Sequence, residues 1–138
     1  MAPKRPYALA MIRHPHFQPL SLDHFTALLL ARSLRSLEDD APVDAALRAV
    51  QNAWDTYLER HIAEEDRELP ALIPPTMLAR MRGDHAELRA RIATLAVKRT
   101  DVAGSLRTFG QLLHDHVRWE EREVFPAAEK SLIAMELS

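Results

Sequence analysis

The 138-residue sequence contains no cysteine, only three glycines and no long apolar run. Without cysteine there are no disulfides, thiolate metal sites, iron–sulfur clusters or cysteine nucleophiles, so nitrogen and oxygen atoms must hold any bound metal. No apolar stretch approaches the length of a membrane span, and the short one near the N-terminus is too brief for a secretory signal. We therefore expect a cytoplasmic protein with no membrane partner.

An excess of charge of one sign is also missing. The chain has 18 Lys and Arg residues against 20 Asp and Glu residues, which gives a formal net charge of −2, and the two signs are mixed along it. A protein that binds nucleic acid through phosphates needs a broad basic field, and a charged tail needs a block of like charges. We expect neither a nucleic-acid partner nor such a tail.

The residues that are abundant favour helices over sheets. Ala, Leu, Arg and Glu are frequent and β-branched runs are few, which is typical of helical proteins. At this length, with 47% hydrophobic residues, the chain can close one core of its own. The predicted fold class is all-α, in a single folded domain.

Apolar residues repeat at helical spacing in four segments. Four prolines among the first 20 residues predict an extended N-terminal arm over residues 1–20, because proline lacks a backbone donor and disfavours helix before it. The bundle then occupies residues 21–138, with Ser21 as the first helix N-cap. The predicted helices span 21 to about 37, about 42 to 70, 76 to 98 and 101 to 126, and Pro126 kinks or ends the last one before a short final helix or frayed tail. The short links between them favour an up-down-up-down antiparallel four-helix bundle.

One pattern occurs twice: an Asp-His dipeptide followed along the chain by His-x-x-x-Glu. In a helix this histidine and glutamate share one face, with Cβ atoms about 5–6 Å apart. Each predicted helix thus has one histidine on its inner stripe, and two helices add a carboxylate. Because burying unpaired charges is costly, the set predicts a centre for Fe, Mn or Zn. The converging side chains are His24, His61, Glu65, His85, His116 and Glu120.

The chain resembles the hemerythrin-like, HHE cation-binding domains from Leu20 to about Leu132. The matching motifs are Leu-Asp-His at 22–24, His-Ile-Ala-Glu-Glu-Asp-Arg-Glu-Leu-Pro at 61–70, Gly-Asp-His at 83–85 and His-Val-Arg-Trp-Glu-Glu-Arg-Glu-Val-Phe-Pro at 116–126. The resemblance implies a hemerythrin-like four-helix bundle with a non-haem di-iron centre, held by one histidine from each helix and two bridging carboxylates. Carried over by position, these are the six residues named above.

The chain departs from the oxygen-carrying hemerythrins in two places. Those proteins take two histidines four apart from the third helix, whereas here Met81 and Arg89 stand four residues on either side of His85. They also end with a His-to-Asp spacing of five, in place of the spacing of four between His116 and Glu120. With six ligands and one oxo or hydroxo bridge, about two of twelve coordination positions stay open. This favours sensing, iron handling or stress chemistry over oxygen transport.

The sequence therefore predicts a protein that holds two non-haem iron ions, with Mn or Zn as alternatives. It would bind or sense a small diatomic ligand, oxygen or nitric oxide, or a peroxide, or handle iron under stress. One alternative is a di-iron enzyme that turns over peroxide or oxygen. Another is a helical interaction module whose site holds zinc or no metal. The sequence identifies no protein partner.

Four further glutamates stay open as ligands. Glu64 and Glu121 each adjoin the predicted glutamate ligand of their helix, and both three and four residues are reachable spacings. Glu68 and Glu123 follow a predicted histidine ligand by seven residues, so they lie on the same stripe two turns along. Solvent exposure or pairing with a neighbouring arginine is the commoner situation for such glutamates.

Other noticeable residues have less specific interpretations. His14 and His16 lie in the proline-rich arm, and His114 points about 200° away from the fourth-helix ligand, so we predict none of them as ligands. Tyr57 stands one turn before the second-helix histidine. Its three interpretations are a hydrogen-bond donor to the site, a gate over the site and a residue that fills the core. Gly83 marks either a close helix approach or a glycine without a structural role.

Overall fold

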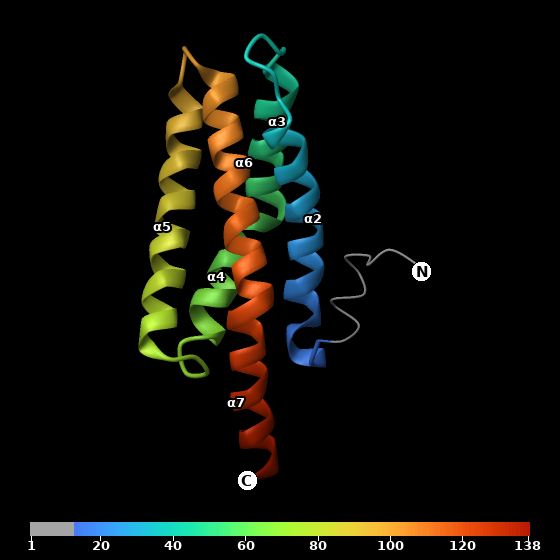
Figure 1. Ribbon diagram of the computed structural model, residues 1–138, viewed down its shortest axis with the longest axis vertical. Helices are drawn as coiled ribbons and strands as arrows, with labels where there is room; N and C mark the ends of the chain where they lie inside the picture. Colours follow the sequence, from blue (N-terminus) through green and yellow to red (C-terminus); the bar gives the residue numbers. More distant parts are fainter. Residues whose placement is uncertain (1–12) are drawn as a thin grey trace, which may run out of the picture.

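The computed structural model describes residues 13–138, which form an antiparallel up-down-up-down bundle of helices (Figure 1). No strand occurs in this part of the chain, so the all-α four-helix prediction is confirmed. Within the same residues, none of the helices has the length and apolar character required to cross a lipid bilayer. The elements in chain order are η1 (Pro15–Phe17), α2 (Gln18–Arg35), α3 (Asp44–Ala53), η2 (Trp54–Leu58), α4 (Glu59–Glu68), α5 (Pro75–Val97), α6 (Val102–Trp119), η3 (Glu120–Val124) and α7 (Phe125–Leu137).

The N-terminal end differs from the prediction. Residues 1–12 of the expected arm lie outside the described residues, but Pro15–Phe17 forms a 3₁₀ turn and α2 begins at Gln18. The arm is therefore not extended up to Leu20, and the assignment of Ser21 as N-cap is wrong. Proline is compatible with the first helical turn, where its missing N–H would be unsatisfied in any case, and Pro19 occupies that turn.

Two of the four bundle helices are interrupted by a π turn without being broken. The N–H of Glu59 donates to the carbonyl of Trp54 in η2, and the N–H of Phe125 donates to the carbonyl of Glu120 in η3. Such single π turns insert one extra residue and are frequent at functional sites. The prediction of a kink or an end at Pro126 is wrong, because this proline lies in the first turn of α7 and the helix runs straight on to Leu137 (Figure 1).

The apolar core is divided into two clusters by a polar layer. One cluster gathers residues of α2, α3, η2, α4, α5 and α6, including Leu34, Trp54, Leu88 and Phe109, and the other lies nearer the α7 end of the bundle. Along α5, Met81 belongs to one cluster and Leu88 to the other, with His85 between them. On α2, Leu20 and Ala27 belong to the two clusters in the same way, with His24 between them. The predicted ligands therefore lie in one layer between two apolar regions.

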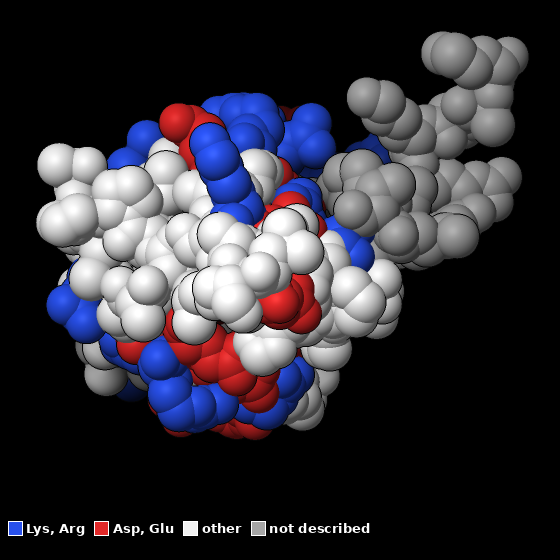
Figure 2. Space-filling model, turned by 90° about the horizontal axis from the view of Figure 1, so that it is seen from below, with Lys and Arg blue, Asp and Glu red and all other residues white. Residues whose placement is uncertain are grey.

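Basic and acidic side chains remain interspersed in the folded protein. The face seen from the end where α7 leaves the bundle carries both signs side by side around a central area of other residues (Figure 2). The charge pattern along the sequence is therefore kept on this surface.

Gly110, and not Gly83, marks a close helix approach. A Cβ atom at Gly110 of α6 would lie 2.8 Å from the Cβ of Leu34 and 3.0 Å from the carbonyl of Ala31, both on α2. At Gly83 no atom of the described residues lies within 4 Å of such an atom, so that glycine has no packing role among them. The sequence did not distinguish the two, because a glycine in a helical pattern does not indicate which neighbour it faces.

We expect Gly110→Ala to destabilise the protein by about 1–3 kcal/mol, because the added methyl group forces α2 and α6 apart. Gly83→Ala is the matched control and should stabilise it by up to about 1 kcal/mol through helix propensity alone. Urea unfolding followed by circular dichroism measures both. Equal effects of the two substitutions would contradict the close approach.

Candidate metal centre

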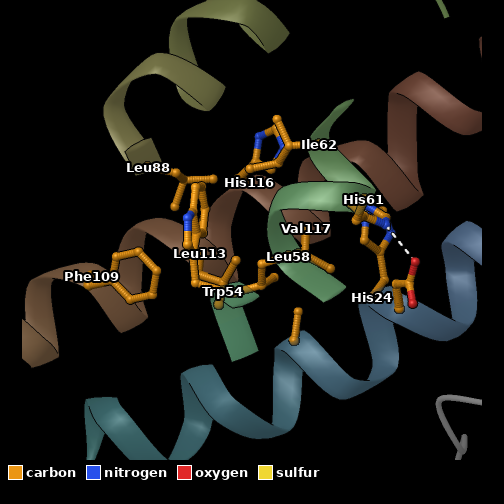
Figure 3. A pocket seen from close by; sticks show the side chains of 12 residues that line it. His24, Trp54, Leu58, His61, Ile62, Leu88, Phe109, Leu113, His116 and Val117 are labelled. Carbon is orange, nitrogen blue, oxygen red and sulfur yellow. Dashed lines mark hydrogen bonds and ion pairs between the residues drawn. The ribbon is translucent and has the colours of Figure 1, made fainter. Parts of the chain in front are cut away.

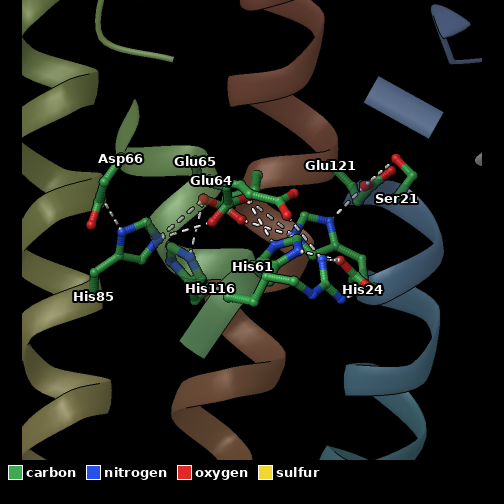
Figure 4. Close-up of polar contacts among 12 residues, drawn as sticks. Ser21, His24, His61, Glu64, Glu65, Asp66, His85, His116 and Glu121 are labelled. Carbon is green, nitrogen blue, oxygen red and sulfur yellow. Dashed lines mark hydrogen bonds and ion pairs between the residues drawn. The ribbon is translucent and has the colours of Figure 1, made fainter. Parts of the chain in front are cut away.

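The six predicted ligands converge in the polar layer between the two apolar clusters, and Figure 4 shows the four histidines with Glu65. Each of them is at most 5% exposed. Within the described residues they form two groups, and the candidate ligand atoms of each group lie within 4.8 Å of one another. The first group contains His24, His61, Glu65 and Glu120, and the second contains Glu65, His85, His116 and Glu120. Both groups share the two glutamates, as expected for two neighbouring cations with common carboxylate ligands.

Glu65 extends across both groups. Its Oε2 atom lies 3.1 Å from Nε2 of His61, one turn earlier on the same helical segment. Its Oε1 atom lies 3.0 Å from Nε2 of His85 on α5. Each oxygen of this carboxylate therefore faces a histidine of a different group.

Glu120 repeats this arrangement from the other side of the layer. Its Oε2 atom lies 3.1 Å from Nε2 of His116, four residues earlier, and its Oε1 atom lies 2.9 Å from Nε2 of His24 on α2. Glu120 is the first residue of η3, so the π turn begins at a candidate bridging ligand. The two carboxylates together have the geometry of a pair of bridges between two cations.

Each histidine turns its Nε2 atom inward because its Nδ1 atom is engaged elsewhere. A carboxylate only accepts hydrogen bonds, so each Nδ1 carries the proton and donates it, which fixes the tautomer and the ring orientation. This carboxylate–histidine pairing is common around protein-bound metals. The four pairs are His24 with Glu121 at 2.7 Å, His61 with Asp23 at 3.1 Å, His85 with Asp66 at 2.7 Å and His116 with Asp84 at 2.9 Å.

Among the described residues, several inward-facing atoms lack a hydrogen-bond partner or lie against another ring nitrogen. The Nε2 atoms of His24 and His61 lie 3.0 Å apart, and in neutral rings with protonated Nδ1 two lone pairs would face each other. Within the described part of the chain, Nε2 of His116 and the Oε2 atoms of Glu65 and Glu120 have no hydrogen-bond partner. Buried polar atoms are normally paired. Cations between them would satisfy all of these atoms, so the donor set fits bound metal ions.

The pKa values reflect the same concentration of charge. Burial acts to lower the pKa of His85, but hydrogen bonds and charges of Glu120 and Glu65 outweigh it and raise that pKa to about 10. Burial also opposes the protonation of His116, yet mainly the charge of Glu120 raises its pKa to about 9. Burial and the charge of Glu120 act to raise the pKa of Glu65, but His61 and other histidines outweigh them and lower it to about 2. Without metal, protons take the place of the cations in this layer.

A sequence model of the hemerythrin HHE cation binding domain matches residues 20–128. The chain belongs to this family. Membership confirms the predicted resemblance and establishes cation binding as the property of the domain. No curated protein and no solved structure matched the chain.

The additional glutamates considered as ligands of this HHE domain lie outside both groups. Glu64 forms an ion pair with Arg60 at 3.1 Å, and Oε2 of Glu68 lies 2.8 Å from Nε2 of His16. Glu123 is exposed. Glu121 is buried, but it accepts a hydrogen bond from a histidine Nδ1 and faces away from the two groups.

Sequence reasoning gave no role to the carboxylates that orient the histidines. Asp23 and Asp84 belong to the repeated Asp-His dipeptide, which was a signal for them. Adjacent residues point about 100° apart on a helix, so neither aspartate orients the histidine next to it. Asp23 reaches His61 and Asp84 reaches His116, each on another helix. Only the packing of the helices makes these pairs.

The remaining residues singled out in the sequence lie elsewhere in the HHE domain. His14 contacts Glu136 and His114 contacts Asp115, so neither ring joins the candidate centre. Tyr57 packs against the apolar cluster, and its hydroxyl has no hydrogen-bond partner within the described residues. Of its three interpretations, the structure supports core filling.

We expect Asp66→Ala to weaken the binding of one metal ion about 10- to 100-fold, because His85 loses the partner that fixes its ring. Asp55→Ala is a suitable control, since Asp55 is exposed and accepts a hydrogen bond from Gln51 on the same helical segment, away from the candidate centre. Competition titration with a chromophoric chelator measures both affinities. An unchanged affinity in Asp66→Ala would contradict an orienting role.

Proposed function

We propose that this HHE domain holds two non-haem iron ions and binds a diatomic gas, oxygen or nitric oxide, reversibly in a sensing role. The proposed ligands are His24, His61, Glu65, His85, His116 and Glu120. The observation that supports a diatomic gas as the ligand is a small apolar cavity beside the candidate centre. The bridging pattern of the carboxylates and the four oriented histidines support the choice of two ions.

The donor set suits non-haem iron. Each group offers two imidazole nitrogens and two carboxylate oxygens, and imidazole with carboxylate suits non-haem iron when positions remain open. Four such donors would complete a tetrahedral zinc, whereas a six-coordinate iron would keep positions for an external ligand. Iron, when bound, supplies a redox-active ion with room for an external ligand. The two apolar clusters enclose the layer and so limit the access of water to that position.

The cavity lies against the candidate centre inside the bundle (Figure 3). Its volume is about 10 Å³, close to the minimum that holds one water-sized molecule. Three of the candidate histidines, together with Asp23, face it, and the other walls are apolar, including Leu58, Phe109 and Val117. A peroxide or water molecule would find few hydrogen-bond partners on such walls, whereas oxygen and nitric oxide need none. The apolar walls therefore favour a diatomic gas over a peroxide, and the bundle must open slightly for either, because both are larger than one water molecule.

The first test is metal analysis of aerobically purified protein with spectra before and after dithionite and nitric oxide. We expect about two irons per chain, reducible charge-transfer bands and a stoichiometric spectral change with nitric oxide. Catalytic consumption of hydrogen peroxide would favour the enzyme alternative instead. Zinc alone, or no metal after anaerobic iron loading, would overturn the proposal.

The cavity itself is tested by filling it. We expect Val117→Leu, which adds a methylene to the cavity wall, to slow nitric oxide binding severalfold while leaving the iron content unchanged. Val124→Leu is the matched control, because Val124 is equally buried but belongs to the other apolar cluster. Stopped-flow mixing of the reduced protein with nitric oxide measures both rates. Equal rates in the two variants would show that nitric oxide does not pass through or occupy the cavity.

A further inference from the structure

Arg13 is a buried arginine that binds the π turn of the candidate metal centre. It is 8% exposed. Its Nη2 atom donates to Oε1 of Glu121 at 2.9 Å and to the carbonyl of the same residue at 3.1 Å. Its Nη1 atom donates to Oε1 of Glu129 at 2.6 Å. The guanidinium therefore joins η3 to α7.

The sequence explains why η3 needs a donor from outside the helix. In η3 the N–H of Phe125 bonds the carbonyl five residues earlier, on Glu120. The next bond of this pattern would come from Pro126 to the carbonyl of Glu121, but proline has no N–H to donate. A buried carbonyl without a partner is costly. Arg13 supplies the missing donor.

The same contact reaches the candidate centre through one side chain. Oε2 of Glu121 accepts hydrogen bonds from Oγ of Ser21 at 2.8 Å and from Nδ1 of His24 at 2.7 Å (Figure 4). Because Arg13 holds the other oxygen, neither end of this carboxylate is free to rotate. Glu120, the preceding residue of η3, lies 2.9 Å from Nε2 of the same histidine. Arg13 thus binds the turn that contacts both nitrogens of His24.

Arginines beside two other orienting carboxylates are placed differently. Arg60 contacts Asp23 and Arg89 contacts Asp66, but these arginine side chains are 51% and 45% exposed. Exposed ion pairs contribute little to the stability of a protein, because solvent screens them. The Arg13 side chain is only 7% exposed, and a buried charge-assisted pair with two donors is stronger and more directional.

We infer that Arg13 is a positioning residue of the metal centre, which fixes η3 and Glu121 so that His24 faces its cation. This inference rests on the proposed metal site. Arg13 and Glu129 both lie outside residues 20–128, the part matched by the family model. The segment before the HHE domain therefore contributes a residue that holds the partner of His24 at one of the two proposed metal positions.

The test uses the full chain loaded with zinc, in which the four Nδ1–H protons give separate downfield signals in nuclear magnetic resonance spectra. We expect Arg13→Gln to shift the His24 signal and to leave the His85 signal in place. It should also weaken one of the two zinc sites by about tenfold, the lower end of the cost of losing an outer partner. Arg89→Gln is the matched control and should change neither property, because that arginine is exposed.

The outcomes separate this inference from the proposed function. A folded Arg13→Gln protein with wild-type zinc affinities and an unshifted His24 signal overturns the inference and leaves the metal site standing. A wild-type protein that binds neither zinc nor iron overturns both. If Arg13→Gln does not fold, Arg13→Lys retains the charge but not the planar fork, and the same two measurements decide. An equal effect of Arg89→Gln would also overturn a specific role for Arg13.

Discussion

Glu65→Gln should lose both metal ions, with affinities reduced by more than about 100-fold, beyond the usual cost of losing an outer partner. The substitution removes a negative charge from both groups at once, because each oxygen of Glu65 faces a histidine of a different group. Glutamine is nearly the same size, so the packing of the layer changes little. Metal analysis by mass spectrometry after anaerobic iron loading measures the loss.

Glu120→Ala and His61→Ala should lower the metal content sharply as well. Glu68→Gln is the matched control for the glutamate substitution, since Glu68 pairs with His16 outside the centre. It should leave two ions bound, and His14→Ala should do the same. Wild-type occupancy in Glu65→Gln would defeat the assignment of Glu65 as a shared ligand.

The second large effect concerns the stability of the metal-free protein at alkaline pH. The pKa of His85 is raised from its ordinary value of 6.5 to about 10, and that of His116 to about 9. A histidine with a raised pKa stabilises the fold fully below pH 6.5, and this contribution disappears as the pH rises through 9 and 10. We expect the free energy of unfolding of the metal-free protein to fall by several kcal/mol between pH 6.5 and 10.

Bound metal should abolish this fall, because the cation replaces the protons as partner of the carboxylates. Metal at about 1,000 times its dissociation constant adds about 4 kcal/mol per site. Urea unfolding at pH 6.5 and pH 9, with excess zinc or with a chelator, measures the difference. Equal stability of the metal-free protein at both pH values would contradict the charge balance described for the layer.

An acidic limit follows from the carboxylates. The pKa of Glu65 is lowered from 4.5 to about 2, so its contribution is complete above pH 4.5 and is lost as the pH falls through 2. Together with the histidines, this places the greatest stability of the metal-free protein between about pH 4.5 and 6.5. Metal affinity should rise over the same range and above it, since metal must displace protons from the imidazoles.

The parts of the fold that depend on local pattern were predictable. Apolar residues at helical spacing indicated four helices, and His-x-x-x-Glu placed ligand pairs on their inner faces. The errors lie where a local signal has two meanings. Ser21 has the side chain of an N-cap, but it lies inside α2 and donates to Glu121. Pro126 resembles a helix terminator, but it lies where the helix resumes after a π turn.

The sequence by itself determined the fold class and the six residues that meet in the polar layer, because these follow from periodicity and spacing within single helices, and its motifs carried the resemblance to the family. Only the tertiary structure decided which carboxylate orients which histidine. Asp23 orients His61, which lies on another helix, because the packing of the helices brings the two side chains together. The contact of Arg13 with Glu121 joins residues 108 positions apart, and no local pattern indicates such a pair. The physical reason is that helix formation depends on near neighbours, whereas the orientation and charge of the candidate centre depend on distant ones.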